Sequence, residues 1–139
     1  MIALSRRYRF PAAHVLRSPA LSDADNARVY GKCANPAGHG HDYGLEITVA
    51  GAVDPATGQI FARDRLDALV GERVLARFGH ALLNDDPAFA EHVPTAENIA
   101  LAIERELAPV IAAERPGTHL LRVRLEETRK NSFETGEAR

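Results

Sequence analysis

Apolar side chains recur at every second position near the start of the chain, at Ile2, Leu4, Tyr8 and Phe10. Only Arg6 interrupts the series. Because successive side chains of a β-strand point to opposite faces, this alternation predicts a strand with one buried face. Proline cannot donate the main-chain hydrogen bond that a sheet requires, so we expect the strand to end at Pro11.

Two further stretches alternate in the same way and predict the rest of an antiparallel sheet. The later one, "HLLRVRLEETRKNSFE", is long enough for the last two strands. Between residues 20 and 34 the chain is polar without a period, so we expect a loop there with no more than one helical turn. The alternating apolar positions are Leu45, Ile47 and Val49 in the earlier stretch and Leu121, Val123 and Leu125 in the later one.

The middle of the chain has the period of a helix in two places. The segment "RDRLDALVGERVLARFG" carries one apolar stripe, and "PTAENIALAIERELAPVIAAE" carries another. Thr95 is a good N-cap for the second helix, and Glu97 lies in its first turn, where the helix dipole favours a negative charge. Pro109 lacks a main-chain N–H, so we expect it to kink or end the last turn.

The elements therefore follow the order β-β-α-α-β-β. The economical arrangement is an α+β fold in which an antiparallel sheet is covered on one face by two helices. A chain of 139 residues is one domain by length, and we assign residues 1–139 to it.

Composition narrows the class of protein. The net charge is −2 and the pI is near 6.3, which does not favour a nucleic-acid or membrane partner. A single cysteine cannot form an internal disulfide, and together with the charges at the start of the chain it favours a reducing, cytoplasmic setting.

The stretch "GKCANPAGHGHDY" holds the candidate chemistry. His39 and His41 are two residues apart on a predicted strand, so both project to one side and can reach one metal ion. If the first two strands form a hairpin, His14 lies beside them and supplies a third imidazole. Three neutral imidazoles with an open fourth position describe a catalytic zinc site, although a His-x-His pair is often structural.

Cys33 leaves three interpretations open. As a fourth ligand it would close the site and make it structural, whereas as a free thiol near Zn²⁺ it would serve as a base or nucleophile. It could also be a small core residue, but the surrounding "YGK" and "ANPAG" are typical of an exposed loop. Glu127 continues the apolar face of the C-terminal strand, and a buried carboxylate there needs a partner that donates hydrogen bonds.

Five segments together resemble the 6-pyruvoyltetrahydropterin synthase family, which includes the 6-carboxytetrahydropterin synthases of queuosine biosynthesis. The resemblance implies the tunnelling fold, or T-fold, in which such units join their sheets into barrels, as a homohexamer built from a dimer of trimers. The segments, in their order along the chain, are "FPAAH", "GKCANPAGHGHDY", "HALLND", "PTAENIA" and "LEETRKNSF".

The resemblance also implies roles for individual residues. One Zn²⁺ per subunit would be held by three histidines, and a thiol would be the catalytic base rather than a ligand. A carboxylate would anchor the pterin ring, and a histidine from a neighbouring subunit would assist proton transfer. The implied residues are His14, His39 and His41 for the metal, Cys33 and His80 for proton transfer, Glu127 for the pterin, and Thr95 near it.

The implied reaction is triphosphate elimination from 7,8-dihydroneopterin triphosphate, with 6-carboxytetrahydropterin formation as the alternative product route. A Mg²⁺ requirement for the triphosphate stays open. The departure from the family pattern is Gly79, because the family usually has an aspartate before the histidine at position 80. Either Asp85 or Asp86 substitutes for that acid, or proton transfer is weakened. In the extreme case the chain is a non-catalytic protein that binds zinc and pterin.

Overall fold

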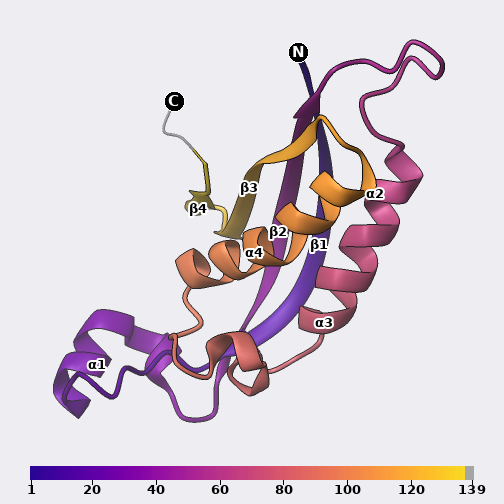
Figure 1. Ribbon diagram of the computed structural model, residues 1–139. Coiled ribbons are helices and arrows are strands. Elements are labelled where there is room, and N and C mark those ends of the chain that lie inside the picture. Colours follow the sequence, from indigo (N-terminus) through magenta and orange to yellow (C-terminus); the bar gives the residue numbers. More distant parts are fainter. Residues whose placement is uncertain (137–139) are drawn as a thin grey trace.

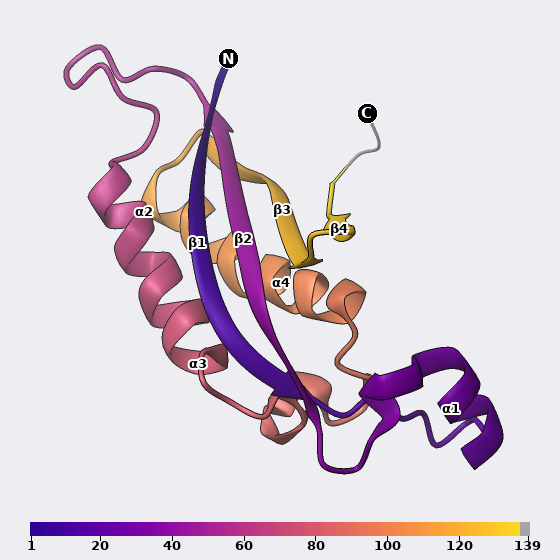
Figure 2. The ribbon, with the colours of Figure 1, turned by 180° about the vertical axis from the view of Figure 1, so that it is seen from behind.

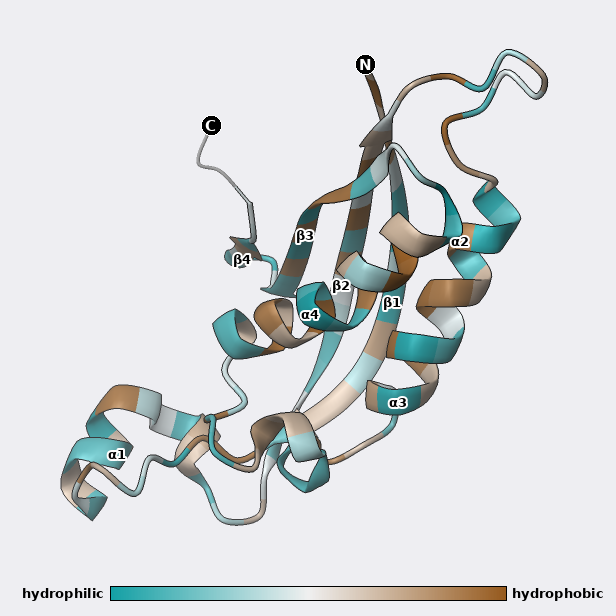
Figure 3. Ribbon diagram, in the orientation of Figure 1, coloured by the Kyte–Doolittle hydropathy of each residue, from teal (hydrophilic) through white to brown (hydrophobic). Residues whose placement is uncertain are grey.

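Four antiparallel strands form one sheet in the order β1-β2-β3-β4 (Figure 1). The computed structural model describes residues 1–136 of the chain. The sheet confirms the α+β arrangement expected from the alternation of apolar residues. This alternation is visible as bands of hydrophobic and hydrophilic residues along β3 (Figure 3). The strands are β1 (Ile2–His14), β2 (His39–Gly51), β3 (Thr118–Thr128) and β4 (Asn131–Glu134).

Helices cover one face of this sheet, and the opposite face is open to view when the molecule is turned (Figure 2). The helical segment predicted from residue 63 forms one unbroken run of helix. Its hydrogen bonds change to the π-helical pattern at Gly71–Leu75. Its apolar stripe and that of the second long helix enclose the core with the inner face of the sheet. The helices are α1 (Asp23–Tyr30), α2 (Arg63–Val70), α3 (Ala76–Phe78) and α4 (Ala96–Glu114). In residues 1–136, no helix is long and apolar enough to cross a membrane.

Strand β1 runs past Pro11 to His14, so the expected end of this strand was wrong. The strand lies at the edge of the sheet, where a proline without an N–H does not break a ladder on both sides. Antiparallel pairing with β2 continues through Pro11 opposite Asp42 to His14 opposite His39. The extra residues bring His14 to the start of β2.

The expected loop between residues 20 and 34 contains an eight-residue helix, α1, followed by a 3-10 turn at Gly31–Ala34. Its N-terminus is capped by the Ser22 hydroxyl, which accepts the N–H of Asp25. Asn26 is the one buried residue of this helix. Without a buried apolar stripe, α1 has no period that the sequence analysis could detect.

Helix α4 does not end at Pro109 but continues to Glu114. Ile111, in the turn after the proline, is fully buried in the core. Its carbonyl accepts the N–H of Arg115 at 3.2 Å and closes the helix. Packing of the last turn therefore outweighs the hydrogen bond that Pro109 cannot make.

Leu121 does not lie on the buried face, and that prediction was wrong. The pairing between β2 and β3 shifts at a β-bulge, where Val49 pairs with Leu120 and Thr48 pairs with Arg122. Leu121 is the extra residue of the bulge and is 39% exposed, while Leu120 packs against the core in its place. A bulge of this kind reverses the inward and outward alternation on one side of itself.

Candidate functional site

Three imidazoles meet where the end of β1 faces the start of β2. The Nε2 atoms of His14 and His41 lie 3.2 Å apart, and the rings are 4.9 Å apart between centroids. His39 adds a third ring, 4.6 Å from that of His41. The hairpin of β1 and β2 therefore brings together the three histidines that the sequence singled out.

Cys33 joins this group from the 3-10 turn that follows α1. Its Sγ lies 3.9 Å from Nε2 of His41. One ligand atom each from His14, Cys33 and His41 fall within 4.8 Å of one another, a set that does not include His39. The sulfur therefore lies within reach of the two imidazoles that would hold a metal ion.

The hydrogen bonds of His14 fix its tautomer. The residue is fully buried, and its Nδ1 lies 2.9 Å from the carbonyl oxygen of Pro94. Because a carbonyl only accepts, Nδ1 carries the proton and Nε2 presents its lone pair to His41. Burial lowers the pKa of His14, which favours this neutral form over the charged one. An imidazole held through its other nitrogen is the arrangement that metal-binding histidines adopt.

The donor set fits a zinc ion. Imidazole nitrogens and a thiol sulfur are the ligand types that zinc prefers, and here they converge from two strands and a turn. Burial lowers the pKa of His41, and the nearby charge of Glu127 opposes that shift. Burial and then Glu127 raise the pKa of the Cys33 thiol, so a positive charge is needed nearby to favour the thiolate.

Glu127 lies close to the cluster, as the predicted face of β3 implied. The antiparallel pairing of β2 with β3 ends with Gly44 opposite Glu126. The next residue along β3, Glu127, therefore lies near Tyr43, the residue before Gly44. Burial and then the charge of Glu127 raise the pKa of Tyr43. The carboxylate is half-buried rather than buried, and it accepts no hydrogen bond from a side chain or main chain within residues 1–136. It is therefore available to a ligand that donates hydrogen bonds.

His80 lies apart from the cluster, on the outer edge of β1. Its side chain is exposed, its φ is 57°, and its N–H donates to the carbonyl oxygen of Pro11 at 2.6 Å. It borders a depression of about 570 Å³ that also reaches Leu82 and His41. It is not part of the group of His14, Cys33 and His41, whose ligand atoms lie within 4.8 Å of one another.

The environment of Gly79 explains why no aspartate stands there. A Cβ at this position would lie 2.5 Å from the carbonyl oxygen of Leu75, the same oxygen that accepts the Gly79 N–H at 2.9 Å. Both oxygens of Asp86, one of the two candidate substitute acids, bind the Arg77 guanidinium at 2.6 and 2.8 Å. Asp85 is exposed in a 3-10 turn.

Thr95 is the N-cap of α4, as predicted, and its hydroxyl accepts the N–H of Asn98 at 3.2 Å. The sequence analysis missed the carbonyl of Pro94, immediately before that cap, as the partner of His14. A proline followed by a capping residue indicates where a helix begins. It does not indicate which distant side chain will bind the carbonyl oxygen of that proline. The two remaining histidines, His92 and His119, are both exposed.

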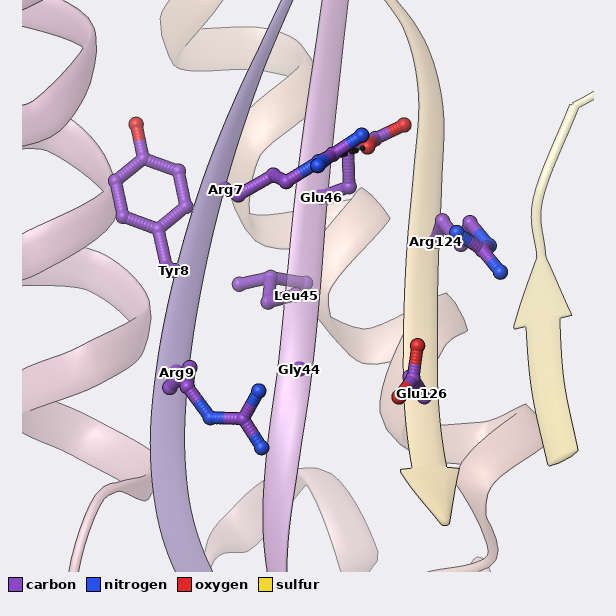
Figure 4. Close-up of a pocket in the computed structure, with 8 residues that line it drawn as sticks. All are labelled: Arg7, Tyr8, Arg9, Gly44, Leu45, Glu46, Arg124 and Glu126. Atoms are coloured by element: carbon purple, nitrogen blue, oxygen red, sulfur yellow. Dashed lines mark hydrogen bonds and ion pairs between the residues drawn. The ribbon is translucent and has the colours of Figure 1, made fainter. Parts of the chain in front are cut away.

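A second depression, of about 520 Å³, lies on the open face of the sheet (Figure 4). Two of its charged groups, Arg7 and Glu46, form an ion pair at 3.0 Å across β1 and β2, while Arg9 binds Asp42 next to it. Neither the histidines nor Cys33 borders it. It is separate from the histidine cluster.

The four-stranded sheet with its helices has the architecture of the T-fold class, and the site is a histidine and cysteine cluster that fits a metal ion. The family model described as 6-pyruvoyl tetrahydropterin synthase matches residues 3–138. The chain therefore belongs to the 6-pyruvoyl tetrahydropterin synthase family.

Individual relatives cover nearly the whole chain. The 6-pyruvoyl tetrahydrobiopterin synthase of Poecilia reticulata is 40% identical over 92% of this chain and 85% of its own. The solved structure of the Caenorhabditis elegans 6-pyruvoyl tetrahydropterin synthase matches with a TM-score of 0.89 at 36% identity, covering 99% of this chain and 96% of that one. A protein of Archaeoglobus fulgidus, provisionally named 6-carboxy-5,6,7,8-tetrahydropterin synthase, is 34% identical over 79% of this chain and 84% of its own.

Proposed function

We propose that this protein is a zinc-dependent 6-pyruvoyltetrahydropterin synthase that eliminates triphosphate from 7,8-dihydroneopterin triphosphate. The observation that carries the proposal is the convergence of His14 and His41, with Nε2 atoms 3.2 Å apart, beside the Cys33 sulfur. The carboxylate of Glu127, which has no hydrogen-bond or ion-pair partner within residues 1–136, lies close enough to influence the pKa of both Cys33 and His41. Family membership, with relatives of that name, supports the same substrate class.

We assign the zinc to His14, His39 and His41, with Cys33 free. When bound there, the ion would polarise hydroxyl oxygens of the substrate side chain and lower the pKa of neighbouring acids. The tautomer of His14, fixed by Pro94, leaves the required nitrogen unprotonated.

The remaining chemistry belongs to the chain's own groups. The Cys33 thiolate removes a proton from the side-chain carbon of the substrate, and Glu127 binds the exocyclic amine and ring N–H of the pterin. Holding the ring by Glu127 keeps the reacting carbon next to the sulfur, which turns proton removal into an intramolecular step. His80 of a neighbouring copy relays the proton, and Thr95 lies near the ring.

The assembly and setting follow from the same family. We infer a homohexamer, a dimer of trimers, in which the open edges of β1 and β4 pair with other copies. A cytoplasmic location is consistent with the single free cysteine. We further propose that a Mg²⁺ ion assists binding of the triphosphate. Measurement of turnover at a series of Mg²⁺ concentrations would test this requirement.

A second product is the main alternative. Loss of triphosphate together with cleavage of the substrate side chain in the same site would yield 6-carboxytetrahydropterin, acetaldehyde and triphosphate, the chemistry of the queuosine pathway. The five residues between Cys33 and His39 resemble the pyruvoyl-forming subgroup. Acetaldehyde in the reaction mixture would replace the pyruvoyl assignment with the carboxy one.

A non-catalytic zinc- and pterin-binding protein is the alternative that Gly79 favours, because a glycine cannot orient His80. The deciding experiment follows triphosphate release from 7,8-dihydroneopterin triphosphate by the zinc-loaded protein and by Cys33→Ala. We expect turnover by the wild type and a loss of about 100- to 10,000-fold in the variant, the usual contribution of a general base. Tight pterin binding without turnover by the wild type would contradict catalysis.

A further inference from the structure

Residues 16–33 form an arm that carries Cys33 and projects from the end of the sheet (Figures 1 and 2). The arm leaves β1 two residues after His14 and returns through α1 into the 3-10 turn of Cys33. The N–H of Leu16 donates to the carbonyl oxygen of Cys33 at 2.6 Å, so the two ends of the arm are joined. A surface loop with adjacent ends holds its shape through side chains of its own.

The side chain that closes this arm is Asn26, which is 1% exposed. Its Oδ1 accepts the N–H of Ser18 at 2.7 Å. Its Nδ2 donates to the carbonyl oxygens of Ser18, Leu21 and Ser22 at 3.1, 3.2 and 3.0 Å. An amide is the one neutral side-chain group that offers both the acceptor and the two donors that this position uses.

Apolar packing by α1 does not perform this task. Asn26 is its one buried residue, and its valine, Val29, is 51% exposed. The helix therefore depends on a polar contact for its place, and a satisfied buried network of this kind is rigid. Because α1 runs directly into the turn of Cys33, its place also sets where the sulfur lies relative to His41.

We propose that Asn26 is a positioning residue for Cys33. It holds the arm closed so that the sulfur stays beside the imidazole cluster. The histidines of that cluster lie on β1 and β2, outside the arm. The proposal rests on the proposed function only where it predicts turnover, since the placement of the sulfur can be measured without substrate. Displacement of a reacting group by about 1 Å can reduce a rate by roughly 100-fold.

The test uses the full-length, zinc-loaded protein with Asn26→Ala and Asn26→Asp. The second variant has the same shape but turns an acceptor toward three carbonyl oxygens. Val29→Ala is the matched control, since it lies on the same helix and is exposed. Alkylation by iodoacetamide at one fixed pH reports on the sulfur, because Cys33 is the only cysteine of the chain.

We expect both Asn26 variants to bind zinc as the wild type does and to have the same unfolding temperature. Their alkylation rate should change by about threefold or more, and kcat should fall by about tenfold or more with KM within roughly twofold. Val29→Ala should match the wild type in each measurement. In the wild type, the amides of Leu16 and Ser18 should be protected from hydrogen exchange although they lie outside any helix or strand, a result that needs no variant.

Two results would overturn the proposal. In one, alkylation and kcat stay at wild-type values while the two amides lose protection, so the arm opens without moving the sulfur. In the other, zinc content and core stability fall in step with activity, which is a purely structural role. If wild-type protein shows no turnover, the proposed function fails, but the alkylation rates and hydrogen exchange still decide the role of Asn26.

Discussion

Nε2 of His14 and Nε2 of His41 face each other at 3.2 Å across the first two strands of the sheet. Because Pro94 holds the proton of His14 on Nδ1, the nitrogen that faces His41 carries a lone pair. Two such nitrogens repel each other unless a cation or proton lies between them. A proton on Nε2 of His41 would relieve this repulsion, and so would the zinc ion proposed for this site, which would then stabilise the fold.

Zinc should therefore raise the unfolding temperature of the metal-free protein. Binding to the native state at a concentration 100-fold above Kd adds about 2.7 kcal/mol to the free energy of unfolding. We expect differential scanning calorimetry to show this shift for the wild type and for Cys33→Ala, but not for His41→Ala. Loss of the shift in Cys33→Ala would make the sulfur a ligand and contradict its assignment as a free base.

A side chain at position 79 should be costly. Gly79→Ala places a methyl group 2.5 Å from the Leu75 carbonyl oxygen, and overpacking of this kind destabilises by about 1–3 kcal/mol. Gly71→Ala is the matched control, because a Cβ there meets nothing within 4 Å and the backbone is already helical. It should stabilise by up to about 1 kcal/mol in urea unfolding. Equal effects of the two substitutions would show that the helix end relaxes around the new side chain.

The ion pair between Arg77 and Asp86 should make stability depend on pH in the acid range. Its hydrogen bonds hold the pKa of Asp86 below the ordinary value, so the native state binds fewer protons than the unfolded chain. The stabilisation is present above the unfolded pKa, near 3.9 for an aspartate in model peptides, and is lost as the pH falls through the lower native pKa. Asp86→Asn should cost about 1–2 kcal/mol at pH 7.

Urea unfolding of wild type and Asp86→Asn at a series of pH values provides the measurement. The difference between them should shrink as the pH falls below the unfolded pKa. Asparagine keeps the oxygen that accepts the Ala88 N–H, so the cap is common to both proteins. A difference that stays constant down to the acid limit would contradict the assignment of the effect to the charge of Asp86.

The bulge on β3 predicts different tolerances for two adjacent leucines. Leu121→Ser should change the free energy of unfolding by no more than about 0.5 kcal/mol, as at an exposed site. Leu120→Ser should cost more than about 1 kcal/mol, because Leu120 packs against the core. The reverse order in thermal unfolding would restore the uninterrupted alternation that the sequence alone favours.

The sequence by itself determined the α+β class and, Leu121 excepted, the apolar face of the sheet. It also determined that His39 and His41 share one side, since the period of a strand fixes the face on which each residue lies. His14 joins them because β1 runs past Pro11 and pairs with β2 as far as His39. The N-cap of α4 at Thr95 was equally legible, because capping depends on neighbouring residues alone.

Only the tertiary structure decided features that depend on distant partners. The bulge that turns Leu121 outward arises from how β3 pairs with β2, and Pro94 reaches His14 because a helix start lies beside the end of a strand. Helix α1 was missed because its buried side chain is a single amide, Asn26, and not an apolar stripe. Periodicity along a chain records which face is buried, but hydrogen bonds between remote segments leave no period.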